Sequence, residues 1–189
     1  MTIAEYKNKL EAYLGNVCMP ADFHEFWTEK MDQPPVSVVV EPVSFANKAA
    51  VYETVTITLD EGCIRGRIIR PVGDGPFPLV LMYHDLNRGI RGWHHMTRFI
   101  AQGYAVAALD APVHKEDWKK TFRNICFAEY IRNALVLAKY AAALPWVDAG
   151  QLVTWGEGLG GGLAIAAAAM LPEKTKCCAL NPMPADLRT

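Results

Sequence analysis

A strand turns into a helix at Gly156-Glu157-Gly158-Leu159-Gly160-Gly161, and this glycine-rich turn decides the fold. Residues 151–155 before it have the apolar and β-branched character of a buried strand. Residues 160–170 after it are mostly small and apolar, which favours a helix packed closely on a sheet. Because glycine carries no Cβ, the helix can begin directly beside the strand.

The rest of the chain predicts an α/β fold. Short β-branched runs over 36–43, 51–58 and 63–70 are typical of antiparallel strands. From Pro78 onward strands alternate with helices, and we expect strands over 79–83, 104–109 and 176–180 and helices over 97–102 and 122–144. This alternation predicts a mostly parallel sheet with helices on both faces.

Length and composition predict a single domain over residues 1–189. A chain of 189 residues with 51% hydrophobic and 21% charged residues is long enough for one sizeable core, and no shift in composition marks a second domain. Residues 1–32 form a helical segment that we expect to pack on this domain across the sheet. Its apolar residues recur at helical spacing: Phe23, Phe26, Trp27 and Met31.

Charge and cysteine content exclude several partners. The net charge is −1 and the basic residues are scattered, so neither nucleic acid nor a membrane surface is an expected partner. The N-terminus lacks a basic, apolar leader and no apolar run is long enough to span a bilayer, which predicts a cytoplasmic protein. Five cysteines without a C-x-x-C pair predict reduced, mostly buried thiols and no metal.

The spacing of the turn matches the motif G-x-S-x-G, with a glycine in place of the serine. In that motif the serine is the nucleophile of an α/β-hydrolase, raised above the sheet on a sharp strand-to-helix turn. Gly158 stands at the serine position, and the only two serines of the chain, Ser37 and Ser44, lie far upstream. The turn therefore predicts an α/β-hydrolase-like fold with a degenerate nucleophile position.

The candidate site residues follow the carboxyl ends of the predicted parallel strands. Ligands of open α/β sheets bind at this edge. Backbone N–H groups of Leu159, and of Tyr83 or its neighbours, are candidates for the oxyanion hole. Four further residues are expected at the rim of the pocket: His84, Asp85, Asp110 and Trp93.

Four stretches of the chain carry a family resemblance: Asp22-Phe23-His24-Glu25-Phe26-Trp27, Tyr83-His84, Pro145-Trp146-Val147-Asp148 and Gly160-Gly161-Gly162. Together they resemble the acetyl xylan esterase / cephalosporin-C deacetylase family, over nearly the whole chain but only the N-terminal part of that family. The resemblance implies an α/β-hydrolase that removes acetyl groups from xylo-oligosaccharides and cephalosporins by a Ser-His-Asp mechanism. It also implies a frequent oligomer and no metal or organic cofactor.

Departures from this family pattern predict an inactive chain. Gly158 replaces the serine, and Leu159 replaces the glutamine that usually follows it. The family's Tyr-His-Gly becomes Tyr83-His84-Asp85, and an ionised Asp85 opposes a developing oxyanion. The resemblance places the triad aspartate and histidine beyond the end of this chain. We therefore expect a domain truncated after strand 176–180, at most trace esterase activity, and a small ester or acetylated sugar as its possible ligand.

Two alternatives to an inactive hydrolase remain open. Strand 176–180 would form an uncovered sheet edge, and such edges recruit partners, which favours a non-catalytic scaffold that self-associates into a homo-oligomer. The chain can also be interpreted as a fragment of a longer esterase, completed by another chain that supplies the missing strands. Neither alternative restores the serine.

Three other patterns in the chain are weaker. Gly156, Gly158 and Gly161 match the dinucleotide motif G-x-G-x-x-G, but the turn comes late and no acidic residue follows at the expected spacing. The pair His94-His95 lacks the spacing of a metal-ligand set. The pair Cys177-Cys178 falls inside a strand, which argues against a replacement nucleophile.

Overall fold

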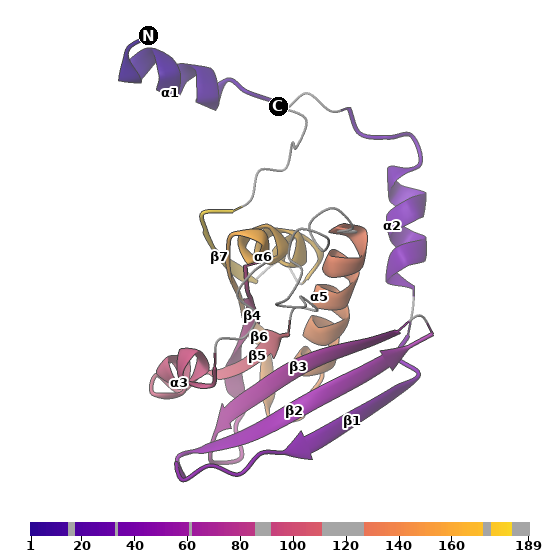
Figure 1. Ribbon diagram of the computed structural model, residues 1–189, viewed down its shortest axis with the longest axis vertical. Coiled ribbons are helices and arrows are strands. Elements are labelled where there is room, and N and C mark those ends of the chain that lie inside the picture. Colours follow the sequence, from indigo (N-terminus) through magenta and orange to yellow (C-terminus); the bar gives the residue numbers. More distant parts are fainter. Residues whose placement is uncertain are drawn as a thin grey trace, which may run out of the picture.

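The computed structural model describes residues 1–14, 18–32, 34–60, 62–85, 92–110, 127–171 and 175–182. Within these residues one seven-stranded sheet has the order β1-β2-β3-β5-β4-β6-β7 (Figure 1). The strands are β1 (Ser37–Pro42), β2 (Ala50–Leu59), β3 (Gly62–Pro71), β4 (Phe77–Tyr83), β5 (Ala105–Leu109), β6 (Val147–Glu157) and β7 (Lys176–Leu180). The helices are α1 (Ile3–Glu11), α2 (Phe23–Met31), α3 (His94–Ile100), α5 (Phe127–Ala142) and α6 (Leu159–Met170).

The sheet has an antiparallel half and a parallel half. Strands β1, β2 and β3 pair antiparallel in sequence order, and β3 pairs antiparallel with β5. Strands β5, β4, β6 and β7 are parallel to one another, with β4 between β5 and β6. The predicted order, an antiparallel start followed by a parallel region, is confirmed, and the carboxyl ends of β4 and β6 meet where the glycine-rich turn begins.

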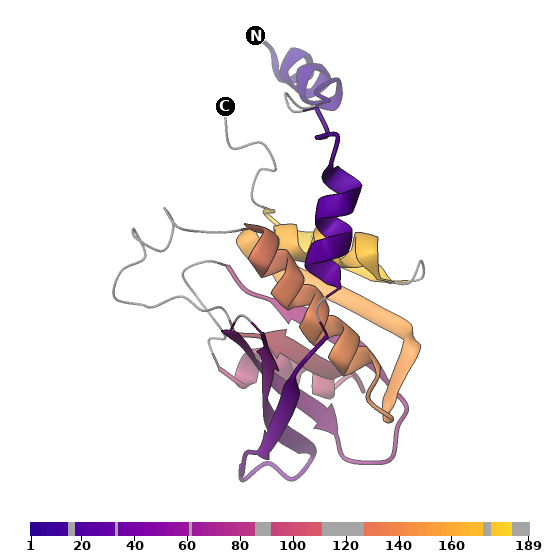
Figure 2. The same ribbon diagram turned by 90° about the vertical axis from the view of Figure 1, so that its right-hand side faces the viewer.

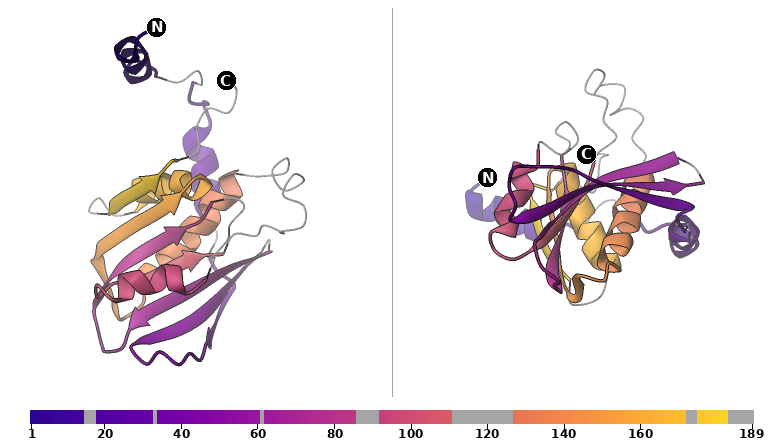
Figure 3. Two further views of the ribbon diagram at one scale, coloured as in Figure 1. Left: turned by 60° about the vertical axis from the view of Figure 1, so that its left-hand side comes forward. Right: turned by 90° about the horizontal axis from the view of Figure 1, so that it is seen from below.

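Helices cover both faces of the sheet, as the alternation predicted. Helices α5 and α6 lie on one face and α3 on the other (Figures 2 and 3). Strand β4 is buried on both sides: Leu79 and Leu81 belong to the larger core under α5 and α6, whereas Val80 and Met82 belong to the smaller core near α3. The sequence of β4 is therefore a continuous apolar run, because neither face of this central parallel strand is in contact with water.

The N-terminal helices lie differently from the expected position across the sheet. Helix α2 stands beside α5, and Met31 at its end packs against the larger core (Figure 1). Helix α1 lies apart from the sheet in the same view. Two residues at its start cap each other. The Thr2 N–H donates to the Glu5 carboxylate at 2.7 Å, and the Glu5 N–H donates to the Thr2 hydroxyl at 3.2 Å.

Several predicted elements differ in extent from the observed ones, and helix α3 begins at His94 rather than at 97. Strand β6 begins at Val147 rather than at 151, and an irregularity in its pairing with β4 lies between Phe77 and Leu79. The early part of β6 is stabilised by Asp148, whose carboxylate accepts the Gly150 N–H at 2.9 Å. The predicted helix over 122–144 is described as α5, and residues 122–126 lie outside the described residues. No helix in the described part is long and apolar enough to cross a membrane.

Candidate functional site

The turn between β6 and α6 holds Gly158 in a conformation that other residues rarely adopt. Gly158 is the N-cap of α6 with φ 60° and ψ −123°. Its N–H donates to the carbonyl oxygen of Leu180 at 3.0 Å, and its own carbonyl accepts the Gly162 N–H at 3.2 Å. A positive φ costs an L-residue with a side chain about 1–2 kcal/mol, whereas glycine adopts it freely. The turn is therefore anchored on both sides of residue 158.

Two neighbouring glycines allow the strands and the helix to meet. A Cβ on Gly156 would overlap with the carbonyl of Gly160, and a Cβ on Gly160 would overlap with the carbonyl of Tyr83. In contrast, a Cβ on Gly162 would meet no other atom within 4 Å. Gly156 and Gly160 are therefore required by backbone packing, independently of any chemistry at the turn.

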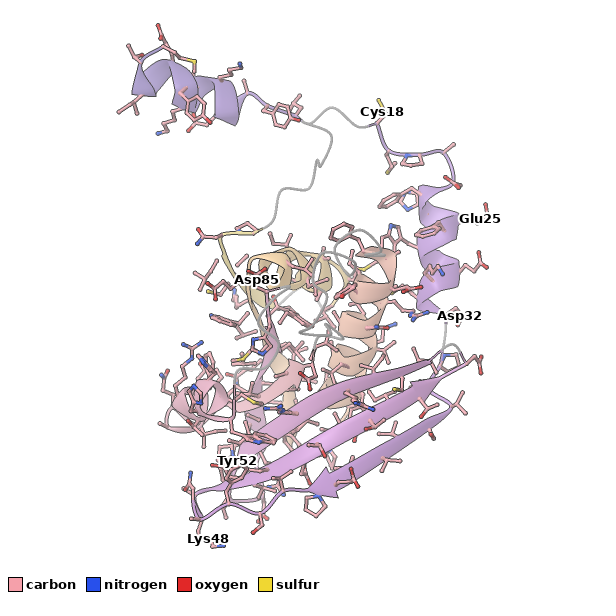
Figure 4. All side chains as sticks on the ribbon, viewed as in Figure 1. Cys18, Glu25, Asp32, Lys48, Tyr52 and Asp85 are labelled. Atoms are coloured by element: carbon pink, nitrogen blue, oxygen red, sulfur yellow. The ribbon has the colours of Figure 1, made fainter. Side chains whose placement is uncertain are left out.

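The carboxylate of Asp85 lies over the turn. Asp85, labelled in Figure 4, follows the end of β4. Its Oδ1 accepts a hydrogen bond from the Leu159 N–H at 3.0 Å. This N–H is the one that the sequence assigns to an oxyanion hole. A Cβ on Gly158 would overlap with Oδ1 and Cγ of Asp85 and would lie 2.8 Å from Oδ2. Asp85 thus occupies the place from which an anion would accept this N–H, and the space that a side chain at position 158 would need.

Tyr83 reaches the turn only through its backbone. Its side chain is 1% exposed, and its hydroxyl donates to the carbonyl of Ala134 on α5 at 3.4 Å. Burial raises the pKa of this phenol far above its usual range. The Tyr83 atom that lies against the turn is its carbonyl oxygen, beside Gly160, and a carbonyl accepts hydrogen bonds rather than donating them.

His84 is a half-buried neutral imidazole beside the turn. Its Nε2 is buried and has no hydrogen-bond partner among the described residues. Burial lowers the pKa of His84 to about 4, and the positive charges of His95 and Arg67 lower it further in the same direction. His84 is therefore uncharged at neutral pH and offers no cation that would stabilise an oxyanion.

Trp93 belongs to an aromatic cluster next to α3. Its ring meets Tyr52 edge-on with centroids 5.3 Å apart, and Phe45 in the same way at 5.8 Å. The guanidinium of Arg67 lies over the Trp93 ring, 5.5 Å from its centroid. Trp93, which the sequence predicts at the pocket rim, is half-buried and contacts neighbours on several sides.

Asp110 lies at the carboxyl edge of the sheet, on the side of β3. It directly follows β5, and its N–H donates to the carbonyl of Arg65 at 2.9 Å. Since β5 and β4 are parallel neighbours, Asp110 and Asp85 follow strands that end at the same edge. Of the predicted site residues, the structure thus brings Asp85, Gly158 and Leu159 into direct contact.

The cysteines differ from their expected environment. Cys18, Cys63, Cys177 and Cys178 are all exposed, so the prediction that the thiols are mostly buried is wrong for these four. The reason for the last pair is that β7 is the edge strand of the described sheet. Cys126 lies outside the described residues. Within the described residues, no group of three or more His, Cys, Asp or Glu side chains could hold a metal ion.

Comparison with solved structures identifies similar folds. The chain superposes on acetyl xylan esterase 1 from Thermoanaerobacterium sp. JW/SL YS485 with a TM-score of 0.76 and 24% identity, covering 97% of this chain and 64% of that one. An acetyl xylan esterase from Paenibacillus sp. R4 gives a TM-score of 0.74 and 20% identity, covering 97% and 65%. These similarities establish the α/β-hydrolase fold.

Curated relatives match shorter segments. Esterase FrsA from Citrobacter koseri is 29% identical over 113 residues, which are 58% of this chain and 26% of that protein. The quorum-quenching protein AidA from Acinetobacter baumannii is 27% identical over 104 residues, which are 54% of this chain and 34% of that protein. The chain therefore spans only a part of the length of each relative.

The family model described as Acetyl xylan esterase (AXE1) matches residues 1–124 and 119–189. These two segments together include the glycine-rich turn, the strand end that carries Asp85 and the N-terminal helices. The resemblance predicted from the four sequence stretches is confirmed. Because the family model matches the chain from end to end, this chain belongs to the acetyl xylan esterase family.

Proposed function

We propose that this chain is a member of the acetyl xylan esterase family that does not hydrolyse esters. The observation that carries the proposal is Gly158 at the nucleophile position of an otherwise well-formed turn. Covalent ester hydrolysis begins with attack by a hydroxyl or thiol that a neighbouring base activates. A glycine supplies no such group, so the first step of the family's reaction has no attacking atom at this position.

The Asp85 carboxylate supports the same proposal through electrostatics. It accepts the Leu159 N–H, the donor that would stabilise an oxyanion. Two like charges about 4 Å apart repel by about 4 kcal/mol at an effective dielectric constant of about 20. A barrier raised by that amount slows a reaction by about three powers of ten. Even a substrate attacked by water would meet this repulsion at the turn.

Nearby hydroxyl and thiol groups do not replace the serine. The Thr154 hydroxyl is fully buried and donates to the carbonyl of Ala164 at 2.9 Å, so it is engaged in the core. Cys177 and Cys178 lie within strand β7 rather than on the turn. A nucleophile needs an activating base and an oxyanion site in fixed geometry. Neither Thr154 on β6 nor the two cysteines on β7 have that arrangement around them in the described residues.

The test is an activity measurement on the purified chain with two substrates, 4-nitrophenyl acetate and acetylated xylo-oligosaccharides. We expect no saturable hydrolysis above the buffer rate and no labelling by a fluorophosphonate probe. The matched pair Gly158→Ser and Gly162→Ser controls for a newly introduced serine, because position 162 has free space around it. Saturable turnover by the unmodified chain, retained through successive purification steps, would refute the proposal.

The edge strand β7 favours a second candidate function, a self-associating scaffold. Strand β7 ends the described sheet, and four of its residues are exposed: Lys176, Cys177, Cys178 and Leu180. An exposed edge with apolar side chains is a template for pairing with another chain. Leu180→Lys should reduce any oligomer seen by analytical ultracentrifugation, whereas Val39→Lys on the opposite edge strand β1 should not. A stable monomer at micromolar concentration would contradict this second candidate.

A further inference from the structure

Asp85 and Gly158 depend on each other across the turn. A side chain at position 158 would overlap with the Asp85 carboxylate, so this carboxylate can stay in place only beside a glycine. The backbone at 158 cannot move away freely, because its N–H is bonded to the Leu180 carbonyl and Gly160 lies against the Tyr83 carbonyl. Any side chain at 158 would therefore force Asp85 to swing away and to release the Leu159 N–H.

Asp85 also caps the N-terminus of α6, which the residues next to this helix in the sequence do not cap. The first N–H groups of a helix have no partner within the helix, and a residue such as Ser, Thr, Asp or Asn at the N-cap usually supplies one. The N-cap of α6 is Gly158, which makes no side-chain cap bond. The carboxylate of Asp85, 74 residues earlier in the chain, bonds to the Leu159 N–H instead. Its negative charge is also favourable at this positive end of the helix.

We propose that Asp85 is a resident carboxylate of the turn, which caps α6, fills the space of the absent nucleophile side chain and excludes carboxylates and acyl oxygens from the Leu159 N–H. The inference rests on the proposed function, since it names the group that occupies the oxyanion position. It adds a coupling between positions 85 and 158 and a ligand class, small carboxylates, that the turn would bind if Asp85 were removed.

A double-mutant cycle on the full chain tests the coupling. The proteins are the unmodified chain, Gly158→Ala, Asp85→Gly and the double variant, and urea unfolding gives the folding equilibrium constant of each. With Asp85 present, Gly158→Ala should lower this constant about tenfold for the positive φ. The lost charged hydrogen bond should lower it at least about tenfold more. In the Asp85→Gly background Gly158→Ala should cost only the roughly tenfold loss that comes from the positive φ. The effect of Gly158→Ala on the folding equilibrium constant should therefore differ between the two backgrounds by at least about tenfold.

Two further variants keep the cycle decisive. Asp85→Asn keeps the size of the side chain but makes only a neutral hydrogen bond, so Gly158→Ala should be less damaging in the Asp85→Asn background than in the unmodified chain and more damaging than in the Asp85→Gly background. The comparison of Asp85→Asn with the unmodified chain stands even if Asp85→Gly fails to fold. Gly162→Ala, a position with free space around it, should be additive with Asp85→Gly. Additivity within about twofold between positions 85 and 158 would overturn the coupling, because independent sites add.

A titration with sodium acetate tests the ligand class. In ¹⁵N-labelled Asp85→Gly protein the Leu159 amide signal should shift saturably with acetate and not with sodium chloride of equal ionic strength. The unmodified chain should show no saturable shift. Equal acetate shifts in both proteins, or none in the variant, would overturn the exclusion of carboxylates by Asp85. Ester turnover by the unmodified chain would instead refute the proposed function, and it would leave the coupling result standing.

Discussion

The carbonyl oxygen of Tyr83 lies against Gly160 with no room for a side chain between them. This contact joins the end of β4 to the first turn of α6. It fixes the helix over the carboxyl edge of the sheet, which is the edge that carries Asp85. The same glycines that would serve a nucleophile are therefore needed for packing alone, and that is a physical reason for the turn to persist in a chain without the serine.

Gly160→Ala should strongly destabilise the fold, whereas Gly162→Ala should not. The added methyl at 160 would overlap with the Tyr83 carbonyl and lie 2.8 Å from the backbone nitrogen of His84, so the backbone must move. Overpacking of this kind costs about 1–3 kcal/mol or more. At 162, inside α6 and in free space, alanine replaces a glycine and should stabilise the helix by about 1 kcal/mol.

Urea unfolding of the three proteins measures this difference. Both substitutions replace a glycine by an alanine in the same helix, two positions apart. The gain in helix propensity is therefore the same for both, and it cancels when the free energies of unfolding of the two variants are compared. A free energy of unfolding that is equal for the two variants would contradict the close contact between α6 and β4.

Much of the fold could be predicted because the sequence carries strong periodic signals. The apolar run of β4, the small-residue helix after the turn and the strand over 176–180 each have one dominant pattern, and these elements lie where expected. The start of β6 was missed, because residues 147–150 belong to the strand although their side chains show little strand pattern. Helix α2 beside α5 depends on tertiary contacts that periodicity does not encode.

The candidate site was less predictable, since it depends on where side chains point. Strand ends and topology bring Asp85 to the same edge as the turn, but the bond to Leu159 joins residues 74 apart and needs the three-dimensional register. Alternation along β4 decides that the Tyr83 side chain enters the core, and this could have been inferred from Leu79 and Leu81 on the same face. The aromatic partners of Trp93 come from distant parts of the chain and left no local signal.

His84 should make the protein less stable as the pH falls from about 6.5 toward 4. Burial lowers the pKa of folded His84 to about 4, below the usual value of 6.5, with His95 and Arg67 adding to the shift. Between these two pH values the unfolded chain binds a proton that the folded chain does not. Above about pH 6.5 the titration of His84 therefore takes nothing from the free energy of unfolding. Below that pH it lowers the free energy of unfolding by at most about 1.4 kcal/mol per pH unit.

The measurement is urea unfolding at several pH values for the unmodified chain and for His84→Gln. The variant lacks this titration, so its free energy of unfolding should fall less steeply over the same interval. An NMR titration of the His84 ring should show a midpoint near pH 4. A midpoint near 6.5 would show that burial and the neighbouring positive charges do not act on this imidazole.

Thr154→Val should loosen the attachment of α6 to β6. The Thr154 hydroxyl, fully buried, donates to the Ala164 carbonyl at 2.9 Å, and valine keeps the shape without the donor. The expected loss in the free energy of unfolding is about 1 kcal/mol. Thr58→Val on β2 makes the same atomic change at a half-buried position and should alter stability by less than about 0.5 kcal/mol. Equal losses in both variants would remove the special role of the Thr154 bond.

Thiol reactivity should distinguish a free β7 edge from one that a second copy covers. Cys63 lies on β3 and Cys177 and Cys178 lie on β7, and all three are exposed. If the chain self-associates through β7, alkylation by iodoacetamide should slow at Cys177 and Cys178 as the protein concentration rises, while the rate at Cys63 stays constant. Leu180→Lys should abolish the slowing, because the added charges repel along the shared edge. Rates at Cys178 that are independent of concentration in both proteins would exclude β7 as the interface, and slowing at Cys63 as well would indicate general aggregation instead.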